Sequence, residues 1–422
     1  MSVRRIAAAL LLFLVTAVPP LHAQESASTS QGENLSRLID TALSNNPELK
    51  ASESRWRSFK SRIKQAGSLD DPMLMLKIQN GIVNDPVNFS KDPMTQKVIG
   101  ISQQLPFFGK RALREEVATH EAESFHYAHE ERKLELVRMV KEAYYQIYFA
   151  DHAVAILDKN IGIIDTFITL AQTKYSVGQG VQQDIYKAQL ERSKMLDMRI
   201  SLEQMRKSQV IALNSLLYRP PTTAVGQIPE FGLGQEPPSA DKLMEMAEES
   251  RPELKSLRAK VLKGESSYKL AKKEYYPDFN VGFEYMQRNN NDDMYSLGVT
   301  FNLPIQRARR DAMVAEANSE INMAQDELMA TRNTIATGIA DLLAQMERRK
   351  KLVELYKTGI IPQAEQSLES ATIGYRVNKV DFLNLLDSRV SLFNYEREYY
   401  DSLADYQVKK AQLEALVGRE LE

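Results

Sequence analysis

The chain has 422 residues, no cysteine and nearly balanced charge, with 54 Lys and Arg against 56 Asp and Glu. The lack of cysteine excludes a disulfide scaffold and an N-terminal cysteine that could carry a lipid. The balanced charge provides no basic field of the kind that attracts nucleic acid, so we expect no nucleic-acid partner.

Residues 1–23 predict a secretory signal peptide. Arg4 and Arg5 form its basic start, residues 6–18 its apolar core, and Leu21-His22-Ala23 a small-residue cleavage site. The core is shorter than the roughly 20 residues that a membrane-spanning helix needs. No later segment is long and apolar enough either, so we expect an exported protein without membrane helices.

The first of two predicted structural repeats covers residues 24–218. We expect a helix over 33–67, two strands at about 72–81 and 95–105, and then a helical stretch from 108 to 175. Apolar residues in that stretch recur with the spacing of a coiled coil. At 1.5 Å per residue it would be roughly 100 Å long, so such helices must pack side by side in an elongated bundle or tube.

A connector rich in proline and glycine follows over 219–239 and should run along the surface. The second repeat, over 240–422, has the same plan: a helix at 240–274, strands at about 278–287 and 294–303, and long helices to the end.

Sequence landmarks in the two halves recur in the same order at an offset of about 200 residues, which indicates an internal duplication. The pairs are Asn46-Pro47-Glu48-Leu49 with Arg251-Pro252-Glu253-Leu254, Pro72 with Pro277, Gly100 and Leu105-Pro106 with Gly298 and Leu303-Pro304, and Tyr175-Ser-Val-Gly178 with Tyr375-Arg-Val-Asn378.

The four predicted strands alternate between apolar and polar residues. Period-two alternation gives each strand one apolar and one polar face, and about ten residues is the length of a tilted strand that crosses a bilayer. In a membrane β-barrel the apolar face would meet lipid and the polar face a water-filled lumen. The residues predicted to face the lumen are Lys77, Gln79, Asn280, Glu284, Thr300 and Asn302.

Four strands are too few to close a membrane barrel, and an open sheet edge in lipid would leave backbone groups unpaired at several kcal/mol each. The chain must therefore oligomerise if these strands face lipid. Two copies would supply eight strands and three copies twelve, and the physical argument does not choose between them.

The duplicated plan, the junction Gln104-Leu105-Pro106-Phe107-Phe108-Gly109-Lys110-Arg111 and the two motifs at Tyr175 and Tyr375 resemble the TolC-type family of bacterial outer-membrane efflux proteins. The resemblance covers essentially the whole mature chain. It implies a mainly α fold with a membrane β-barrel portion: a homotrimer with a twelve-stranded barrel in the outer membrane and a helical tunnel across the periplasm. The junction most resembles the heavy-metal-efflux branch.

The resemblance also implies a gated periplasmic entrance and two partners, a periplasmic adaptor protein and an inner-membrane pump of the resistance-nodulation-division type. Asp184 matches an acidic residue of the first tip, Tyr375 matches a tyrosine of the network that closes the entrance, and Asp387 matches one of two acidic rings that narrow it. Asn384 falls where the family has a second acidic ring, and Val380 where it has a linking arginine. A plainer interpretation is that Asp184 and Asp387 are solvated helix residues.

Other signals carry less weight. His126 and His129 have a spacing that can hold zinc, but without a third ligand they are better explained as polar residues on the surface of a long helix. Met73 and Met75 share a strand face and suggest either soft-metal handling or packing.

The sequence contains no catalytic motif, so we expect neither an enzyme, a resident metal nor a cofactor. The main alternative function is an exported periplasmic coiled-coil adaptor or scaffold without a channel. That alternative explains the coiled-coil spacing of the long helices but not the paired strands with one apolar and one polar face.

Overall fold

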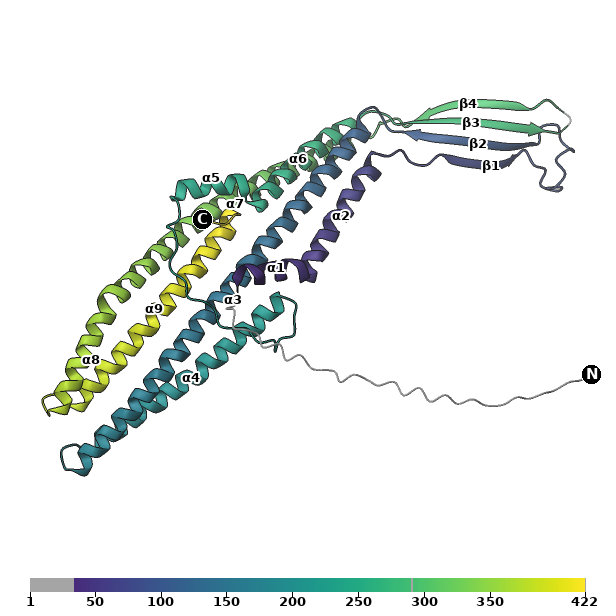
Figure 1. Cartoon of the computed structure of the whole chain (residues 1–422). Helices are drawn as coiled ribbons and strands as arrows, with labels where there is room; N and C mark the ends of the chain where they lie inside the picture. Colours follow the sequence, from purple (N-terminus) through teal and green to yellow (C-terminus); the bar gives the residue numbers. More distant parts are fainter. Residues whose placement is uncertain (1–33, 290, 422) are drawn as a thin grey trace, which may run out of the picture.

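The computed structural model describes residues 34–289 and 291–421, so the predicted signal peptide lies outside the described residues. A four-stranded sheet projects from one end of an elongated helical bundle, and two helix-to-helix turns form the other end (Figure 1). The first half contains α1 (Leu35–Asn45), α2 (Pro47–Gly67), β1 (Met73–Gln79), β2 (Gln96–Leu105), α3 (Lys110–Ser176) and α4 (Gln182–Leu216). The second half contains α5 (Ala240–Ser250), α6 (Pro252–Lys273), β3 (Phe279–Arg288), β4 (Met294–Phe301), α7 (Arg307–Leu355), the π-helical turn η1 (Tyr356–Ile360), α8 (Ile361–Arg376) and α9 (Phe382–Val417).

Each half begins with two separate helices, one of 11 residues and one of 21 or 22, so the single helices predicted over 33–67 and 240–274 are wrong. The break falls at Asn46 in the first half and at Arg251 in the second, and both residues are extended. Each of them precedes a proline, whose ring disfavours the helical conformation of the residue before it. The proline then starts the next helix, where its missing N–H is harmless.

The four strands form one antiparallel sheet in the order β1-β2-β3-β4. Leu74 lies opposite Ile101, Ile101 opposite Phe283, and Phe283 opposite Leu297, which fixes one continuous register across the sheet. The ends of all four observed strands lie within two residues of the predicted ranges. Within the described chain, β1 and β4 are the two edges of the sheet.

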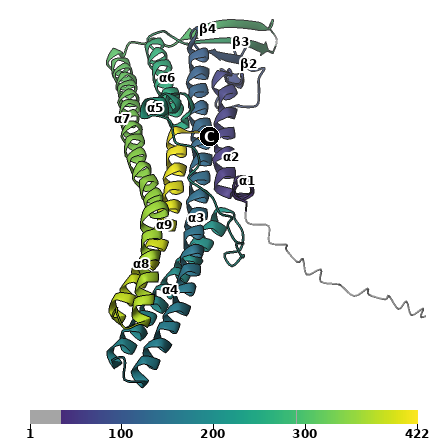
Figure 2. The ribbon, with the colours of Figure 1, turned by 60° about the vertical axis from the view of Figure 1, so that its left-hand side comes forward.

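The long helix α3 is the central helix of the bundle and packs against α2, α4, α6 and α9. It forms a hairpin with α4, and α9 forms a second hairpin with the helices α7 and α8. Figure 2 shows both hairpins running away from the sheet toward the same end. The fold class is therefore confirmed in its coarse form: a mainly α, internally duplicated chain with four strands.

The helix formed by α7 and α8 is interrupted by the π-helical turn η1. Pro362 lies just after this turn, at the start of α8. A proline inside a helix removes one backbone hydrogen bond and clashes with the carbonyl four residues earlier, and a π-turn is one way in which a helix accommodates that change. Among the described residues, no helix combines the length and the apolar character needed to cross a membrane.

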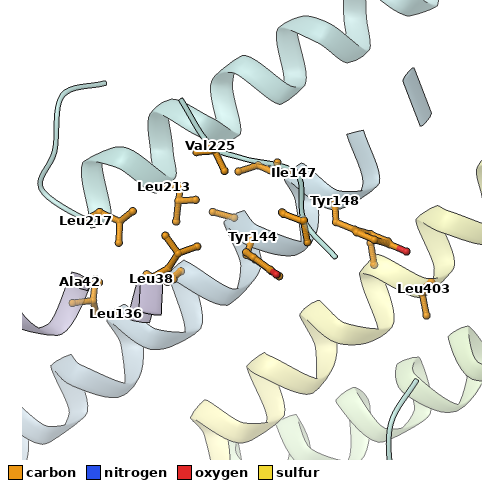
Figure 3. Packing of buried hydrophobic residues seen from close by; sticks show 14 of the residues in the cluster. Leu38, Ala42, Leu136, Tyr144, Ile147, Tyr148, Leu213, Leu217, Val225 and Leu403 are labelled. Carbon is orange, nitrogen blue, oxygen red and sulfur yellow. The ribbon is translucent and has the colours of Figure 1, made fainter. Parts of the chain in front are cut away.

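The core consists of three apolar clusters along the bundle. In one of them, Leu38 of α1, Ile147 of α3 and Leu213 of α4 meet with Val225 of the connector (Figure 3). Val225 and Ile228 are buried, and the Asn214 side chain donates to the carbonyl groups of Pro221 and Thr223. The connector is thus non-helical, as predicted, and is held to the bundle by these contacts.

Candidate functional site

The sheet has two chemically different faces. One face carries mostly polar, small and methionine side chains, and the other carries mostly large apolar side chains, the majority of which are exposed in the described chain. Leu74, Leu76 and Leu297 of the apolar face are 69%, 70% and 71% exposed. Exposed apolar patches of this kind mark contact with another protein or with lipid. The apolar residues of this face are Leu74, Leu76, Ile78, Ile99, Ile101, Leu105, Phe279, Val281, Phe283, Tyr285, Tyr295, Leu297, Val299 and Phe301. Three polar residues, Lys97, Gln103 and Gln287, lie on the same face.

Five of the six residues predicted to face a lumen, namely Lys77, Gln79, Asn280, Glu284 and Thr300, share the opposite face. The Lys77 Nζ atom lies 3.4 Å from a carboxylate oxygen of Glu284. A hollow of about 290 Å³ on this face is lined by Asn280, Glu284 and Thr300, among others. Asn302 follows the end of β4, and its side-chain oxygen accepts a hydrogen bond of 2.7 Å from the Asp278 N–H.

The polar face also holds methionines and glycines. Met73 and Met75 lie on it, and the Met75 methyl group sits over Gly100, where a Cβ atom would come within 3.0 Å. Met286 and Met294 lie opposite each other on the same face. The methionines of β1 thus pack on the polar face of the sheet.

The two turns at the far end of the bundle have the same geometry, as the duplication predicts. Gly178 and Asn378 both adopt the left-handed conformation, with φ of 75° and 59°. In each turn the backbone N–H of the next residue donates to a carbonyl five residues earlier, at Lys174 or at Gly374. Such an arrangement caps the C-terminus of a helix and reverses the chain.

Lys174 connects the two hairpins at this tip. Its ammonium group donates to the carbonyl oxygen of Tyr375 and to the side-chain oxygen of Asn378, and lies 4.1 Å from the centroid of the Tyr375 ring. The sequence comparison placed a missing arginine at Val380, whereas the structure supplies a cation from the other hairpin. Nothing in the sequence around Lys174 indicates this role, because only the tertiary structure brings residues 174 and 375 together.

The remaining tip residues surround this link. Tyr375 is buried, and its hydroxyl group has no hydrogen-bond partner among the described residues. Burial raises the pKa of Tyr375, and the nearby Asp184 carboxylate raises it further. Burial also raises the pKa of Asp184, with a further contribution from Asp381. Asp184 and Tyr375 are thus near enough for the carboxylate charge to act on the tyrosine.

Asn384 and Asp387 are both exposed and lie one turn apart on α9, away from buried Leu385 and Leu386. The backbone N–H of Asn384 donates to Asp381, which caps α9. The structure therefore leaves both predicted ring positions on a face of α9 that is open in the single chain.

A second buried lysine joins the sheet to the bundle. Lys110 is only 1% exposed, and its ammonium group lies 2.9 Å from Asp278 and 3.2 Å from Glu274. It also donates to the carbonyl oxygen of Tyr276, while the Phe107 N–H donates to Asp278. Burial alone would raise the pKa of Asp278, but these hydrogen bonds and the Lys110 charge hold it below its usual value.

The histidine pair has a packing role. His129 is buried, and its Nδ1 atom lies 2.7 Å from the Ser52 hydroxyl oxygen, while His126 packs 4.5 Å from the Trp56 ring. The expectation that both are surface residues is wrong for His129, because α2 covers it. Within residues 34–289 and 291–421, no cluster of three or more His, Asp or Glu side chains is placed to hold a metal ion.

The described chain is mainly α and duplicated. It has a sheet with one polar and one apolar face at one end, and two helical hairpins at the other. The sequence matches the family model described as outer membrane efflux protein over residues 38–217 and 243–419. The chain therefore belongs to the outer membrane efflux protein family, and the predicted family is confirmed.

Individual relatives agree with this assignment. The chain is 25% identical over 181 residues to the cobalt-zinc-cadmium resistance protein CzcC of Cupriavidus metallidurans, a match that spans 43% of each chain. Its fold is similar to that of CusC (TM-score 0.79, 16% identity, 92% of this chain and 93% of that one). It is also similar to the outer membrane protein VceC of Vibrio cholerae (TM-score 0.77, 17% identity, 92% and 97%) and the outer-membrane channel MtrE of Neisseria gonorrhoeae (0.77, 16%, 92% and 89%).

Proposed function

We propose that this chain is the outer-membrane channel of a tripartite efflux system and works as a homotrimer. The observation that carries the proposal is the sheet, with one polar face, one exposed apolar face and two open edges. An open edge in lipid is costly, so the edges must pair between copies. Three copies give a closed barrel of twelve strands with the polar face inside, and the helical hairpins extend it as a periplasmic tunnel.

The far turns form the gated entrance of this tunnel. The link from Lys174 to Tyr375 and Asn378 holds the two hairpins of one chain together, which supports a closed resting state. A periplasmic adaptor and an inner-membrane pump of the resistance-nodulation-division type would open it by engaging the hairpins. Conduction through the open tunnel is passive.

Heavy-metal cations are the proposed cargo. The likeness to a cobalt-zinc-cadmium resistance protein supports this class. Exposed Asp387 near the entrance and Glu284 on the polar face of the sheet would favour cations in a lumen, since carboxylate rings select them.

Conductance of the purified mature chain tests the channel. Reconstituted into planar bilayers, it should form stable, cation-selective pores, and detergent-extracted protein should sediment as a trimer. A chain that stays soluble, monomeric and non-conducting without detergent would instead support the periplasmic adaptor or scaffold. Cells that lack the gene test the metal cargo, and they should be more sensitive to zinc, cadmium and cobalt. Unchanged sensitivity to all three metals would exclude these cations as cargo.

A further inference from the structure

An apolar hollow of about 670 Å³ lies where the sheet meets α3. Its wall includes Leu105, Phe279, Val281 and Val299, which all belong to the exposed apolar face of the sheet. The hollow is therefore a continuation of the surface that faces lipid in the proposed channel, at the end of the sheet nearest the periplasm. Its volume lies within the range of ligand pockets.

Charged groups line the helical side of this hollow. Arg111 of α3 donates through Nε to the Gly67 carbonyl oxygen at 3.0 Å. Within the part of the chain that the structure describes, the Arg111 guanidinium forms no ion pair, so its terminal nitrogen atoms are available to a ligand. Glu115 lies one helical turn further along, also in the lining, beside Gly67.

Aromatic side chains and a second cation mark the rim. Phe108 is 81% exposed, although it is a large aromatic residue. Phe107 lines the hollow and stacks on Tyr276, and the Lys273 ammonium group lies 5.6 Å from the centroid of each ring. Aromatic rings with nearby cations are typical of the level where membrane proteins meet lipid headgroups.

We propose that this hollow binds one phospholipid of the periplasmic leaflet with an amine-bearing, zwitterionic headgroup such as phosphatidylethanolamine. An acyl chain fills the apolar part, the phosphate pairs with Arg111, and the headgroup ammonium pairs with Glu115. A guanidinium binds a phosphate through paired hydrogen bonds, and a primary ammonium donates to a carboxylate, so both charges are matched. This inference rests on the proposed function, because only a membrane channel presents the apolar face to lipid.

Quenching of a single tryptophan by brominated lipids tests the proposal. The chain has one tryptophan, Trp56 in α2, so the double variant Trp56→Phe/Phe108→Trp carries one reporter, at the rim of the hollow. We expect brominated phosphatidylethanolamine to quench it with an affinity at least about threefold higher than brominated phosphatidylcholine or phosphatidylglycerol. Arg111→Gln should lower the affinity for all three lipids, because each carries a phosphate, and Glu115→Gln should remove the preference for phosphatidylethanolamine over the other two.

Arg309→Gln is the matched control, because Arg309 is an exposed arginine in the first turn of α7, outside the hollow, and it should leave the preference unchanged. Equal quenching by the three lipids would overturn the proposal. So would an unquenched reporter in a conducting trimer, which would mean that a neighbouring chain covers the hollow. Conductance is measured on the same samples, so failure of the channel itself is recognised separately. If the Phe108→Trp variant does not assemble, Leu69→Trp provides a second reporter in the same lining.

Discussion

At the scale of single residues, the two tip hairpins differ in a way that explains the link between them. Lys174 of the first hairpin corresponds to Gly374 in the second, and Gly180 to Val380. A Cβ atom on Gly374 would come within 2.5 Å of the Val380 side chain, and one on Gly180 within 3.2 Å of Lys174. Each hairpin therefore pairs one small with one larger residue, and only the first provides a cation.

Lys174→Met should loosen the closed tip. The substitution keeps most of the aliphatic side chain but removes the hydrogen bonds to Tyr375 and Asn378 and the contact with the Tyr375 ring. A charged hydrogen bond contributes about 1.5 kcal/mol or more, so the ratio of open to closed channels should rise by about tenfold. Single-channel recording measures this ratio. Lys187→Met, at an exposed lysine of α4, is the control, and an equal change in both variants would refute the link.

Asp387→Asn should lower the cation selectivity of single channels. The substitution removes one negative charge per chain from a position on α9 that is exposed in the single chain. Threefold repetition would make that position a ring of carboxylates. Asn384→Asp adds a charge one turn away and should raise the cation selectivity. Reversal potentials in a salt gradient measure the selectivity of both variants. Unchanged reversal potentials in both variants would place the selective ring elsewhere.

At the scale of elements, the alternation of side chains along a strand determines which environment each residue enters. A shift of one residue would move every side chain to the other face. Ile101 and Ser102 are neighbours in β2, but Ile101 lies between Leu74 and Phe283, and Ser102 between Met73 and Gly282. The two faces can therefore be tested at adjacent positions of one strand.

Ile101→Arg should abolish assembly in the outer membrane, whereas Ser102→Arg should be tolerated and should reduce conductance. An arginine on the lipid face costs about 2–4 kcal/mol per chain near the bilayer midplane, while one on the lumen face stays hydrated. The measurement is the amount of detergent-resistant trimer in isolated outer membranes. Equal trimer yields from the two variants would contradict the assignment of the faces.

At the scale of the whole molecule, the sheet and the bundle meet through a small polar network. Lys110 at the start of α3 and Asp278 before β3 come from different repeats, yet they form one buried ion pair. Gly109, which directly precedes Lys110, has a φ of 85° that favours glycine and lets the chain turn from β2 into α3. This junction fixes how the sheet sits on the helical bundle.

Lys110→Met should destabilise the protein by about 3–5 kcal/mol, because it leaves the Asp278 and Glu274 carboxylates without their buried partner. Denaturant unfolding in detergent measures this change. The double variant Lys110→Met/Asp278→Asn should recover part of the loss, since it removes one of the unpaired charges. A double variant less stable than Lys110→Met would argue against the ion pair as the source of the effect.

The sequence by itself determined the periodic and duplicated parts of this protein. Strand faces, long helices and the left-handed turns at Gly178 and Asn378 follow from local patterns that each segment carries. The breaks at Asn46 and Arg251 also follow from the local sequence, because each residue precedes a proline that disfavours its helical conformation.

Only the tertiary structure decided which distant residues meet. Lys174 reaches Tyr375, Lys110 reaches Asp278, and Arg111 borders a hollow made by strands of both repeats. Nothing in the neighbourhood of these residues in the sequence distinguishes them from other lysines and arginines on long helices. The physical reason is that periodicity records which face of an element is apolar, whereas the partner of a buried charge depends on how separate elements pack.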